Sequence, residues 1–335
     1  MSIAVGVIGM GVMGAEHAQL LQHETRGAHL MAVCDADASR LAQGHAEIFD
    51  DPLALIRSDK VEAVVIASPD DTHEALVLAA ISEGKPVLCE KPLAATPQQA
   101  ERILEAEILF GRRLVQVGFM RRFDPAYEEL RTAYLSGTVG QAVLLHNIHR
   151  NAQAPGWFSG AMALTNAFVH EIDVSRWLLG AEMGQAQVFA GPGGEPLMIQ
   201  MQSKTGVMVS TEVFMNASYG YHVHAELVGR EGAISMAPPA LSLVNRARWH
   251  GHGWPENWLP RFKDAYRQQM QAWVNSIATG VPVGASAWDG YIASSIADQL
   301  AAGLAKGRDG AAAISLLHPV PDPLYAVGAH INERV

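Results

Sequence analysis

The fold is decided near the start of the chain, by the stretch Val5-Gly6-Val7-Ile8-Gly9-Met10-Gly11-Val12-Met13-Gly14. An apolar run from Ile3 to Ile8, rich in β-branched residues, is typical of a buried parallel strand. A helical pattern follows it through Leu21. The glycines between strand and helix therefore stand where the first turn of a dinucleotide-binding fold carries its G-x-G-x-x-G motif.

Each of the three glycines has its own role in such a turn. Gly9 permits the tight turn out of the strand, and Gly11 lets a pyrophosphate approach the backbone. Gly14 allows the helix to pack closely on the strand. The N–H groups at the start of the helix would then face the anion. We expect the cofactor to contact Gly9, Gly11, Val12, Met13 and Gly14.

The second half of the motif follows about 20 residues later. Residues 30–34 form another apolar run, which ends in Asp35. An acidic residue there accepts hydrogen bonds from the ribose hydroxyls of NAD and would repel the 2′-phosphate of NADP. A loop or helix-capping aspartate is the alternative interpretation. The sequence favours NAD, although Arg40 is near enough to soften that preference.

Composition limits the classes of protein to consider. A chain of 335 residues, 49% of them hydrophobic, can bury a large core and predicts two domains. A net charge of −10 gives no electrostatic basis for binding nucleic acid. We expect no signal peptide and no membrane span, hence a cytoplasmic protein, because no apolar run is long enough.

Cys34 and Cys89 each end an apolar run, which favours small core residues over a disulfide or a metal site.

The first third of the chain alternates strands with helices, which predicts a doubly wound parallel sheet. Strands are expected at residues 61–67, 86–89 and 114–117. One helix would end near Glu83 with Thr72 as its N-cap, and another would span 97–110. Ligands bind at the carboxyl ends of such strands. The cofactor contacts expected there are Ser68, Pro69, His73, Glu90 and Lys91.

Beyond Gly118 the pattern changes to longer alternating segments, at residues 142–149, 206–216 and 221–228. These predict a large, mostly antiparallel open sheet. Helices expected at 165–179 and 262–279 would cover one face, and Gly191 to Pro196 would form a hairpin turn.

The uncovered face of this sheet favours a homo-oligomer, either a dimer or a tetramer. The whole chain therefore predicts an α/β protein of two domains. Residues 1–118 would form a Rossmann domain that binds NAD. Residues 119–335 would form a domain for substrate binding and oligomerisation.

Two groups of residues carry possible chemistry. Lys91, at the tip of a predicted strand, would lie beside the nicotinamide and could hold a substrate hydroxyl; a surface lysine or a salt bridge to Glu90 is the alternative. Read as a helix, residues 165–178 bring Asn166, His170 and Asp173 to one face. His170 would then be a general acid/base working near neutral pH, or a histidine satisfied by Asp173.

These segments together resemble the Gfo/Idh/MocA oxidoreductase family. The resemblance rests on the glycine motif, on Asp35, and on the segments Glu90-Lys91-Pro92 and His170-Glu171-Ile172-Asp173. Further stretches are similar to the inositol 2-dehydrogenase branch of that family. They are residues 118–124, 149–151, 216–221 and 287–291. The similar blocks span nearly the whole chain in the same order.

The resemblance implies NAD-dependent oxidation of a secondary alcohol on a cyclic polyol, such as myo-inositol or a related cyclitol, to the keto-inositol. Lys91 would orient the hydroxyl, and His170 would remove its proton as hydride leaves to NAD. The residues implied to grip the polyol are Met120, Arg121, His149, Asn151, Asn166, His170 and Tyr221.

One position departs from the family pattern. Where the family has aspartate four residues before the histidine, this chain has Asn166, which carries no charge and cannot take a proton. We expect the chemistry to survive, because Lys91 and His170 remain, and substrate selection to shift towards another cyclitol or a sugar. An aldose, glycoside or aminocyclitol dehydrogenase is thus one alternative. A non-catalytic NAD-binding sensor is another.

Overall fold

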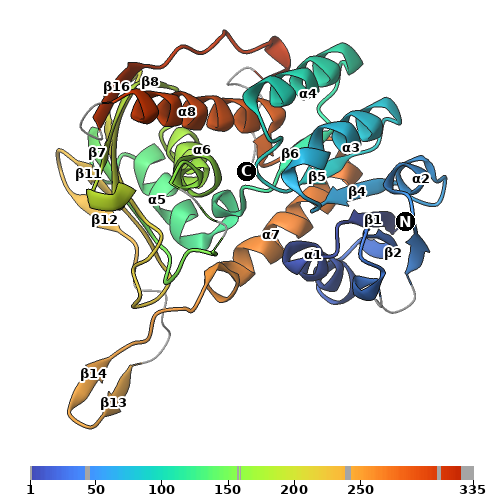
Figure 1. The fold of residues 1–335 in the computed structure, drawn as a ribbon, viewed down its shortest axis with the longest axis horizontal. Coiled ribbons are helices and arrows are strands. Elements are labelled where there is room, and N and C mark those ends of the chain that lie inside the picture. The colour runs from blue at the N-terminus through green and yellow to red at the C-terminus, as the bar shows by residue number, and fades with distance from the viewer. Residues whose placement is uncertain are drawn as a thin grey trace. The chain divides into compact units, whose positions relative to one another are not determined.

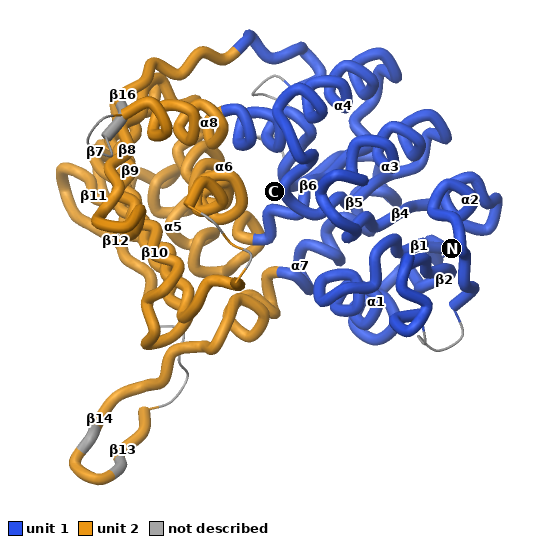
Figure 2. Tube along the Cα trace, viewed as in Figure 1, with its two compact units in different colours: residues 1–120, 266–295, 319–335 blue, residues 121–265, 296–318 orange. Residues whose placement is uncertain are grey.

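The computed structural model describes residues 2–41, 46–156, 158, 160–237, 243–307 and 311–325. Within them the chain forms two compact units (Figure 2). The first unit contains residues 1–120, 266–295 and 319–335, and the second contains 121–265 and 296–318. The predicted division into 1–118 and 119–335 follows the order of the chain, whereas the compact units are discontinuous.

The first unit is built on a seven-stranded sheet in the order β15-β6-β5-β4-β1-β2-β3 (Figure 1). Its strands pair in parallel, except β15, which pairs antiparallel with β6. The predicted doubly wound sheet is therefore confirmed. The strands are β1 Ile3–Ile8, β2 Ala28–Cys34, β3 Glu47–Phe49, β4 Ala63–Ile66, β5 Val87–Cys89, β6 Val115–Val117 and β15 Ala285–Ser286.

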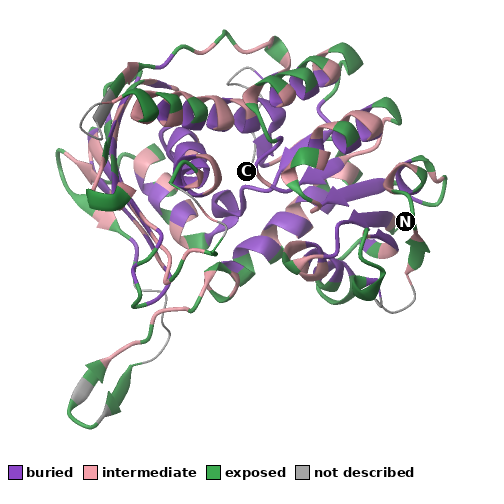
Figure 3. Cartoon of the chain, in the orientation of Figure 1, coloured by how far each residue is buried: buried purple, intermediate pink, exposed green. Residues whose placement is uncertain are grey.

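These central strands are apolar because helices cover both of their faces. Every residue of β4 is fully buried, and Figure 3 draws the middle of this sheet as buried throughout. Cys34 and Cys89 are unpaired and buried at strand ends, as predicted. The helices are α1 Val12–His23, α2 Pro52–Arg57, α3 Asp70–Ser82, α4 Pro97–Phe110 and the 3₁₀ turns η1 Ala38–Arg40 and η5 Pro323–Tyr325.

Two local predictions in this unit met different outcomes. Helix α4 has the predicted bounds, because Thr96 and Gln99 form a capping box ahead of it and Gly111 ends it in a left-handed conformation. The prediction of Thr72 as an N-cap was wrong. Helix α3 already begins at Asp70, and the Thr72 hydroxyl bonds the Pro69 carbonyl from inside the first turn. The short strand β3 was not predicted.

The second unit is built on another seven-stranded sheet, in the order β12-β11-β7-β10-β9-β8-β16. All its pairs are antiparallel except β10 with β7, which confirms the mostly antiparallel prediction. The strands are β7 Ala142–Arg150, β8 Met183–Ala190, β9 Leu197–Ser203, β10 Met208–Phe214, β11 His222–Gly229, β12 Ala233–Ser235 and β16 Ala311–Ser315. Gly191–Pro196 connects β8 to β9 as the predicted hairpin turn, which includes the 3₁₀ turn η4 Pro192–Gly194.

The two faces of this sheet differ in burial. Along β7, Leu145, Asn147 and His149 are buried, and they alternate with less buried residues. The covering helices of this unit include α5 Pro125–Leu135 and α6 Val169–Leu179 (Figure 1). The opposite face leaves Met198 and Met208 more than a third exposed.

The remaining elements complete the two units. Helix α7 Trp258–Thr279 begins four residues before its predicted start, and both α7 and α8 Ala287–Lys306 pass from one unit into the other. A small hairpin pairs β13 Val244–Arg246 with β14 Trp249–Gly251, and η2 Met120–Phe123 is a 3₁₀ turn. Among the described helices, none is long and apolar enough to cross a lipid bilayer.

Candidate active site

The glycine turn in the first unit has the geometry that its sequence predicts. Gly9 has φ of +86°, and a Cβ there would overlap the backbone of Ala67 and Ser68. A Cβ on Gly14 would overlap the carbonyl oxygen of Gly9. Gly11 is different, because its nearest neighbour would be Arg40, 4.0 Å away. The protein itself does not require glycine at position 11, which fits a backbone kept open for a ligand.

Gly11 is also the N-cap of α1, and no side chain caps that helix end. Val12 and Met13 form its first turn, in which there is no acidic residue. The amide dipoles of a helix start attract anions, and a pyrophosphate could bond these N–H groups directly. The arrangement fits the phosphates of a dinucleotide.

Asp35 follows β2 and closes over the glycine turn. Its carboxylate accepts hydrogen bonds from the backbone N–H groups of Met10 (2.5 Å) and Asp37 (2.8 Å). The guanidinium of Arg40 lies 4.0 Å from the same carboxylate and 3.3 Å from that of Asp37. Asp35 is therefore held in place by two backbone donors, with a half-exposed arginine beside it.

Three more of the predicted cofactor residues follow β4. Ser68 and Pro69 form the turn into α3, where the Ser68 hydroxyl pairs with that of Thr72 at 2.6 Å. His73 is 1% exposed, and its ring nitrogens lie 2.9 Å from the Ser68 carbonyl and 2.8 Å from the Pro92 carbonyl. A contact between His73 and the cofactor would have to open one of these bonds. The ring instead links the β4 turn to the segment after β5.

That segment carries Glu90 and Lys91, and its Lys91-Pro92 peptide bond is cis. Glu90 is buried, and its carboxylate bonds the His17 ring at 2.8 Å and accepts from the Lys91 backbone N–H at 3.3 Å. Lys91 is half-buried at the carboxyl end of β5. Glu90 thus anchors the backbone that carries Lys91, through a partner on α1.

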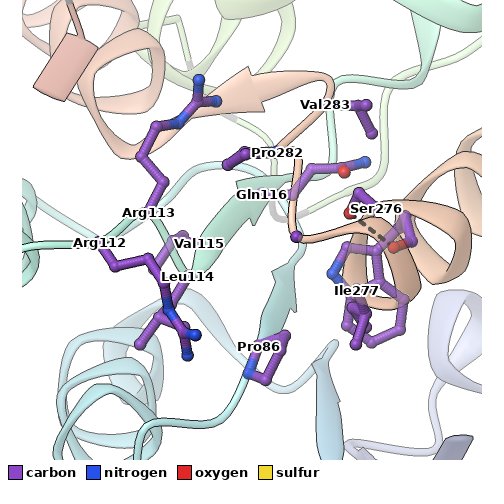
Figure 4. A pocket seen from close by; sticks show the side chains of 12 residues that line it. Pro86, Arg112, Arg113, Leu114, Val115, Gln116, Ser276, Ile277, Pro282 and Val283 are labelled. Carbon is purple, nitrogen blue, oxygen red and sulfur yellow. Dashed lines mark hydrogen bonds between the residues drawn. The ribbon is translucent and has the colours of Figure 1, made fainter.

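A cavity of about 180 Å³ in the first unit lies at the other end of these strands. Its lining includes Pro86 and Leu114, which precede β5 and β6, and Ser276 near the end of α7 (Figure 4). Gln116 extends its amide towards Ser276 in that view. The glycine turn, Asp35 and Lys91 all follow the carboxyl ends of their strands. The cavity is therefore separate from the predicted cofactor site.

A buried charged cluster forms the centre of the second unit. Arg121 is 1% exposed, and its guanidinium forms an ion pair with the fully buried Glu171. The Nδ1 atom of His149 lies 3.0 and 3.1 Å from the two carboxylate oxygens of Glu171, and 3.3 Å from Arg121. Helix α6 supplies Glu171, β7 supplies His149, and the start of the unit supplies Arg121.

Burial and ion pairing together set the protonation states of the residues in this cluster. Burial by itself would raise the pKa of Glu171, but the charge of Arg121 and the hydrogen bonds from Arg121 and His149 outweigh it and hold the pKa below its ordinary value. Burial would likewise lower the pKa of Arg121, and Glu171 reverses that shift. Burial raises the pKa of Tyr221 to about 12. Arg121 is thus a cation, Glu171 an anion and Tyr221 a neutral donor.

Three rings at this cluster belong to predicted polyol contacts. The His149 ring lies 6.1 Å from that of Tyr221 and 6.4 Å from that of His170. Asn151 follows the end of β7, where its backbone bonds Phe214 and Ala217. Arg121, His149, His170 and Tyr221 are therefore brought together within the second unit. Lys91 and the buried Met120 belong to the first unit.

The helix predicted at 165–179 is not uniform. Residues Ala163–Phe168 form a π-helix, and the α-helix begins only at Val169. Asn166 therefore lies in the π-helix and His170 in the α-helix, a change of helix type that the sequence did not predict. A π-helical turn widens the backbone and is frequent at functional sites. Asp173 lies within the α-helix, where Arg122 donates two hydrogen bonds to it, at 2.6 and 3.0 Å.

Comparison with known proteins decides the family. Residues 3–119 match the Gfo/Idh/MocA model of an oxidoreductase family with an NAD-binding Rossmann fold, and 146–309 match the model of its C-terminal α/β domain. Inositol 2-dehydrogenase 1 of Saccharopolyspora erythraea is 46% identical, over 89% of this chain and 93% of its own. The chain belongs to the Gfo/Idh/MocA oxidoreductase family.

Two solved structures are similar to this chain over nine tenths or more of its length. The myo-inositol dehydrogenase of Lactobacillus casei, in complex with NAD(H) and myo-inositol, has a TM-score of 0.91 at 29% identity, over 97% of this chain and 100% of its own. The scyllo-inositol dehydrogenase of the same organism, with NAD(H) and scyllo-inositol, has a TM-score of 0.81 at 25% identity, over 90% and 96%. The cofactor of this family member is therefore NAD, as predicted.

Two residues of this Gfo/Idh/MocA protein support the site and were not among the predicted contacts. His17 holds Glu90, and Glu171 holds both Arg121 and His149. Glu171 follows His170 directly, so the acidic residue next to the histidine was visible in the sequence. Its partners lie 50 and 22 residues earlier, where local pattern gives no signal. Among the described residues, no group of three or more His, Cys, Asp or Glu is arranged to hold a metal ion.

Proposed function

We propose that this protein is an NAD-dependent inositol 2-dehydrogenase, which oxidises one secondary alcohol of a cyclic polyol to a ketone. The observation that carries the proposal is the buried group Arg121, His149 and Tyr221 next to His170. Such a concentration of donors and acceptors suits a ring in which every carbon bears a hydroxyl. The 46% identity to an inositol 2-dehydrogenase supports the same substrate class.

The proton chemistry is assigned to Lys91 and His170. The Lys91 ammonium group donates a hydrogen bond to the reacting hydroxyl and fixes its direction. The His170 imidazole accepts the proton of that hydroxyl as the carbonyl forms, because a neutral imidazole is a suitable base near neutral pH. Asn166 orients the hydroxyl by hydrogen bonding and takes no proton. NAD, when bound, supplies the hydride acceptor.

Substrate selection is assigned to Met120, Arg121, His149, Asn151 and Tyr221. A hydroxyl buried without a hydrogen-bond partner costs about 1–3 kcal/mol. An isomer with one inverted hydroxyl leaves one group on the ring and one on the protein unsatisfied. The site would therefore separate stereoisomers by roughly tenfold or more in kcat/KM for each misplaced hydroxyl.

A substrate panel tests this function. NADH formation is measured at mildly alkaline pH with myo-inositol, scyllo-inositol, other inositols, glucose and xylose, with NADP in parallel. Rapid NADH formation with one inositol is the expected result. Turnover with sugars alone would overturn the cyclitol assignment and keep the chemistry. Tight NAD binding without turnover on any substrate would favour a sensor protein.

We further propose that the protein is a cytoplasmic homo-oligomer. Phe189 and Met198 are paired neighbours on the uncovered sheet face, and each is about 40% exposed. A second copy would remove this apolar surface from water. Sedimentation velocity is expected to give a dimer or a tetramer, and Met198→Lys should shift it towards the monomer. A wild-type monomer at micromolar concentration would contradict the proposal.

A further inference from the structure

Glu171 occupies an unusual place for a carboxylate. It is fully buried, and described partners of its two oxygens are Arg121 and His149. Taking a carboxylate out of water is costly unless it is paired and hydrogen-bonded. Both partners are predicted substrate contacts, and they come from different parts of the second unit. One carboxylate therefore sets the positions of two side chains in the candidate site.

The same contacts select a tautomer of His149. Its Nδ1 atom faces two carboxylate oxygens at 3.0 and 3.1 Å and the Arg121 guanidinium at the longer distance of 3.3 Å. An ionised carboxylate can only accept hydrogen bonds. A bare Nδ1 lone pair would face both oxygens and be repelled, whereas an Nδ1–H group donates to them. A neutral imidazole with its proton on Nδ1 has an acceptor at Nε2.

We propose that Glu171 is a positioning residue of the substrate site, which holds His149 as the Nδ1–H tautomer so that Nε2 accepts a hydrogen bond from a polyol hydroxyl. The proposal rests on the proposed function. Arg121, held by the same carboxylate, is a donor at any pH at which the protein is folded. A donor and an acceptor fixed by one buried group would match a ring whose hydroxyls must donate in one place and accept in another.

Substitution by glutamine tests this arrangement most sharply. In Glu171→Gln, the amide oxygen still accepts from Arg121, but the amide NH₂ group faces His149 and donates to Nδ1. The imidazole proton then moves to Nε2, and the acceptor for substrate becomes a donor. We expect the KM for the preferred polyol to rise roughly tenfold, the effect of about one lost hydrogen bond, with kcat changed less than threefold. The KM for NAD should not change.

Asp124→Asn is the matched control. The Asp124 carboxylate is 4% exposed and accepts two hydrogen bonds from Arg261, at 2.8 and 3.1 Å. Its described partners include an arginine and no histidine. Asp124→Asn therefore removes a buried negative charge beside an arginine, as Glu171→Gln does, but has no described effect on a histidine. We expect this variant to lose stability as Glu171→Gln does and to keep the wild-type KM for polyol. An equal rise of KM in both variants would reduce Glu171 to a structural role.

A second readout does not depend on turnover. The ¹⁵N shifts of histidine-labelled protein report the tautomer, and His149→Gln assigns the signal. The wild type is expected to show a proton on Nδ1, and Glu171→Gln a proton on Nε2. If Glu171→Gln does not fold, the wild type still decides, because a proton on Nε2 of its His149 would contradict the proposal directly. An unchanged tautomer in a folded Glu171→Gln would overturn it as well. A wild type that oxidises no inositol would overturn only the proposed function, while the tautomer result still decides the role of Glu171.

Discussion

Gly14 packs so closely on Gly9 that a side chain on Gly14 would overlap the carbonyl oxygen of Gly9. This contact lets α1 start close to the end of β1, so that the uncapped N-terminal N–H groups of α1 lie at the glycine turn. Gly11, between them, has no such neighbour. The same motif thus contains two glycines that the packing requires and one, Gly11, at which the protein leaves room for a side chain.

A pair of alanine substitutions separates these roles. Gly14→Ala forces the helix away from β1 and should destabilise the protein by about 3 kcal/mol, as an overpacked core does. Gly11→Ala should lower the free energy of unfolding by no more than about 1 kcal/mol, the cost of an alanine at a helix N-cap. It should still raise the Kd for NADH about tenfold or more, because its methyl group would occupy the space of the phosphates. Denaturant unfolding and NADH fluorescence measure the two effects. Normal NADH binding by Gly11→Ala would refute this account of the turn.

Asp35 should decide between the two dinucleotides. A hydrogen bond to a charged group contributes about 1.5–3 kcal/mol, so Asp35→Ala should lower kcat/KM for NAD roughly 10- to 100-fold. Activity with NADP should rise, because the like charge is gone and Arg40 stands beside the position. The double variant Asp35→Ala/Arg40→Ala is the control and should lose the gain with NADP. An unchanged NAD to NADP ratio in Asp35→Ala would contradict the assigned role.

Lys91 should be needed for chemistry and not for cofactor binding. Lys91→Met keeps the length of the side chain and removes its donor, so kcat should fall about 10²- to 10⁴-fold, the usual contribution of a positioned acid or base. The Kd for NADH should change less than about threefold, or 0.7 kcal/mol. Glu90→Gln serves as the comparison, because it weakens the bond to His17 and leaves the ammonium group in place. A Lys91→Met enzyme with near wild-type kcat would remove Lys91 from the mechanism.

Asn166 should tune the site without supplying its base. Asn166→Asp restores the family residue and adds an anion, so we expect the kcat ratio between inositol isomers and sugars to change by at least threefold, or about 0.7 kcal/mol. The substrate panel used for the wild type provides the measurement. If neither rate nor preference changes, position 166 has no influence on selection.

The second unit should lose folding stability in acid, because its sheet carries His222. Burial lowers the pKa of His222, and the positive charges of Arg150 and His224 lower it further. The negative charge of Glu212 opposes them only in part, so the pKa is about 4, against an ordinary value of 6.5. Between these two values the unfolded chain binds more protons than the folded one, so stability falls as the pH is lowered from 6.5 towards 4. Because His222 is partly exposed, the loss should be about 1–2 kcal/mol. His222→Gln should show a smaller loss in urea unfolding at matched protein concentration, and an equal slope would exclude His222 as the cause.

How far the sequence predicts this structure depends on how local each cause is. The glycine turn and α4 were predicted closely, because Gly9, Gly14 and the Thr96 capping box act within a few residues. Thr72 was assigned as a cap on residue type alone, although α3 begins at Asp70 without a side-chain cap. A local signal can therefore also place the start of a helix about half a turn away from its position in the structure.

The site was predictable in its members but not in its connections. Arg121, His149 and Tyr221 came from resemblance, and the structure adds Glu171 as the group that joins Arg121 to His149. The π-helix around Asn166 gave no signal, because its sequence also suits an ordinary helix. Contacts between residues far apart in the sequence, and irregular turns such as the π-helix, depend on how the whole chain packs. A short stretch of sequence therefore does not reveal them.

The most direct test of the central claim follows hydrogen from the substrate. The enzyme is supplied with NAD and an inositol deuterated at the carbon that is oxidised, and the NADH formed is analysed by mass spectrometry. Our account predicts NADH heavier by one deuterium in the wild type, and none formed at a comparable rate by Lys91→Met. NADH without deuterium, or no NADH from any inositol while NAD binds, would contradict it.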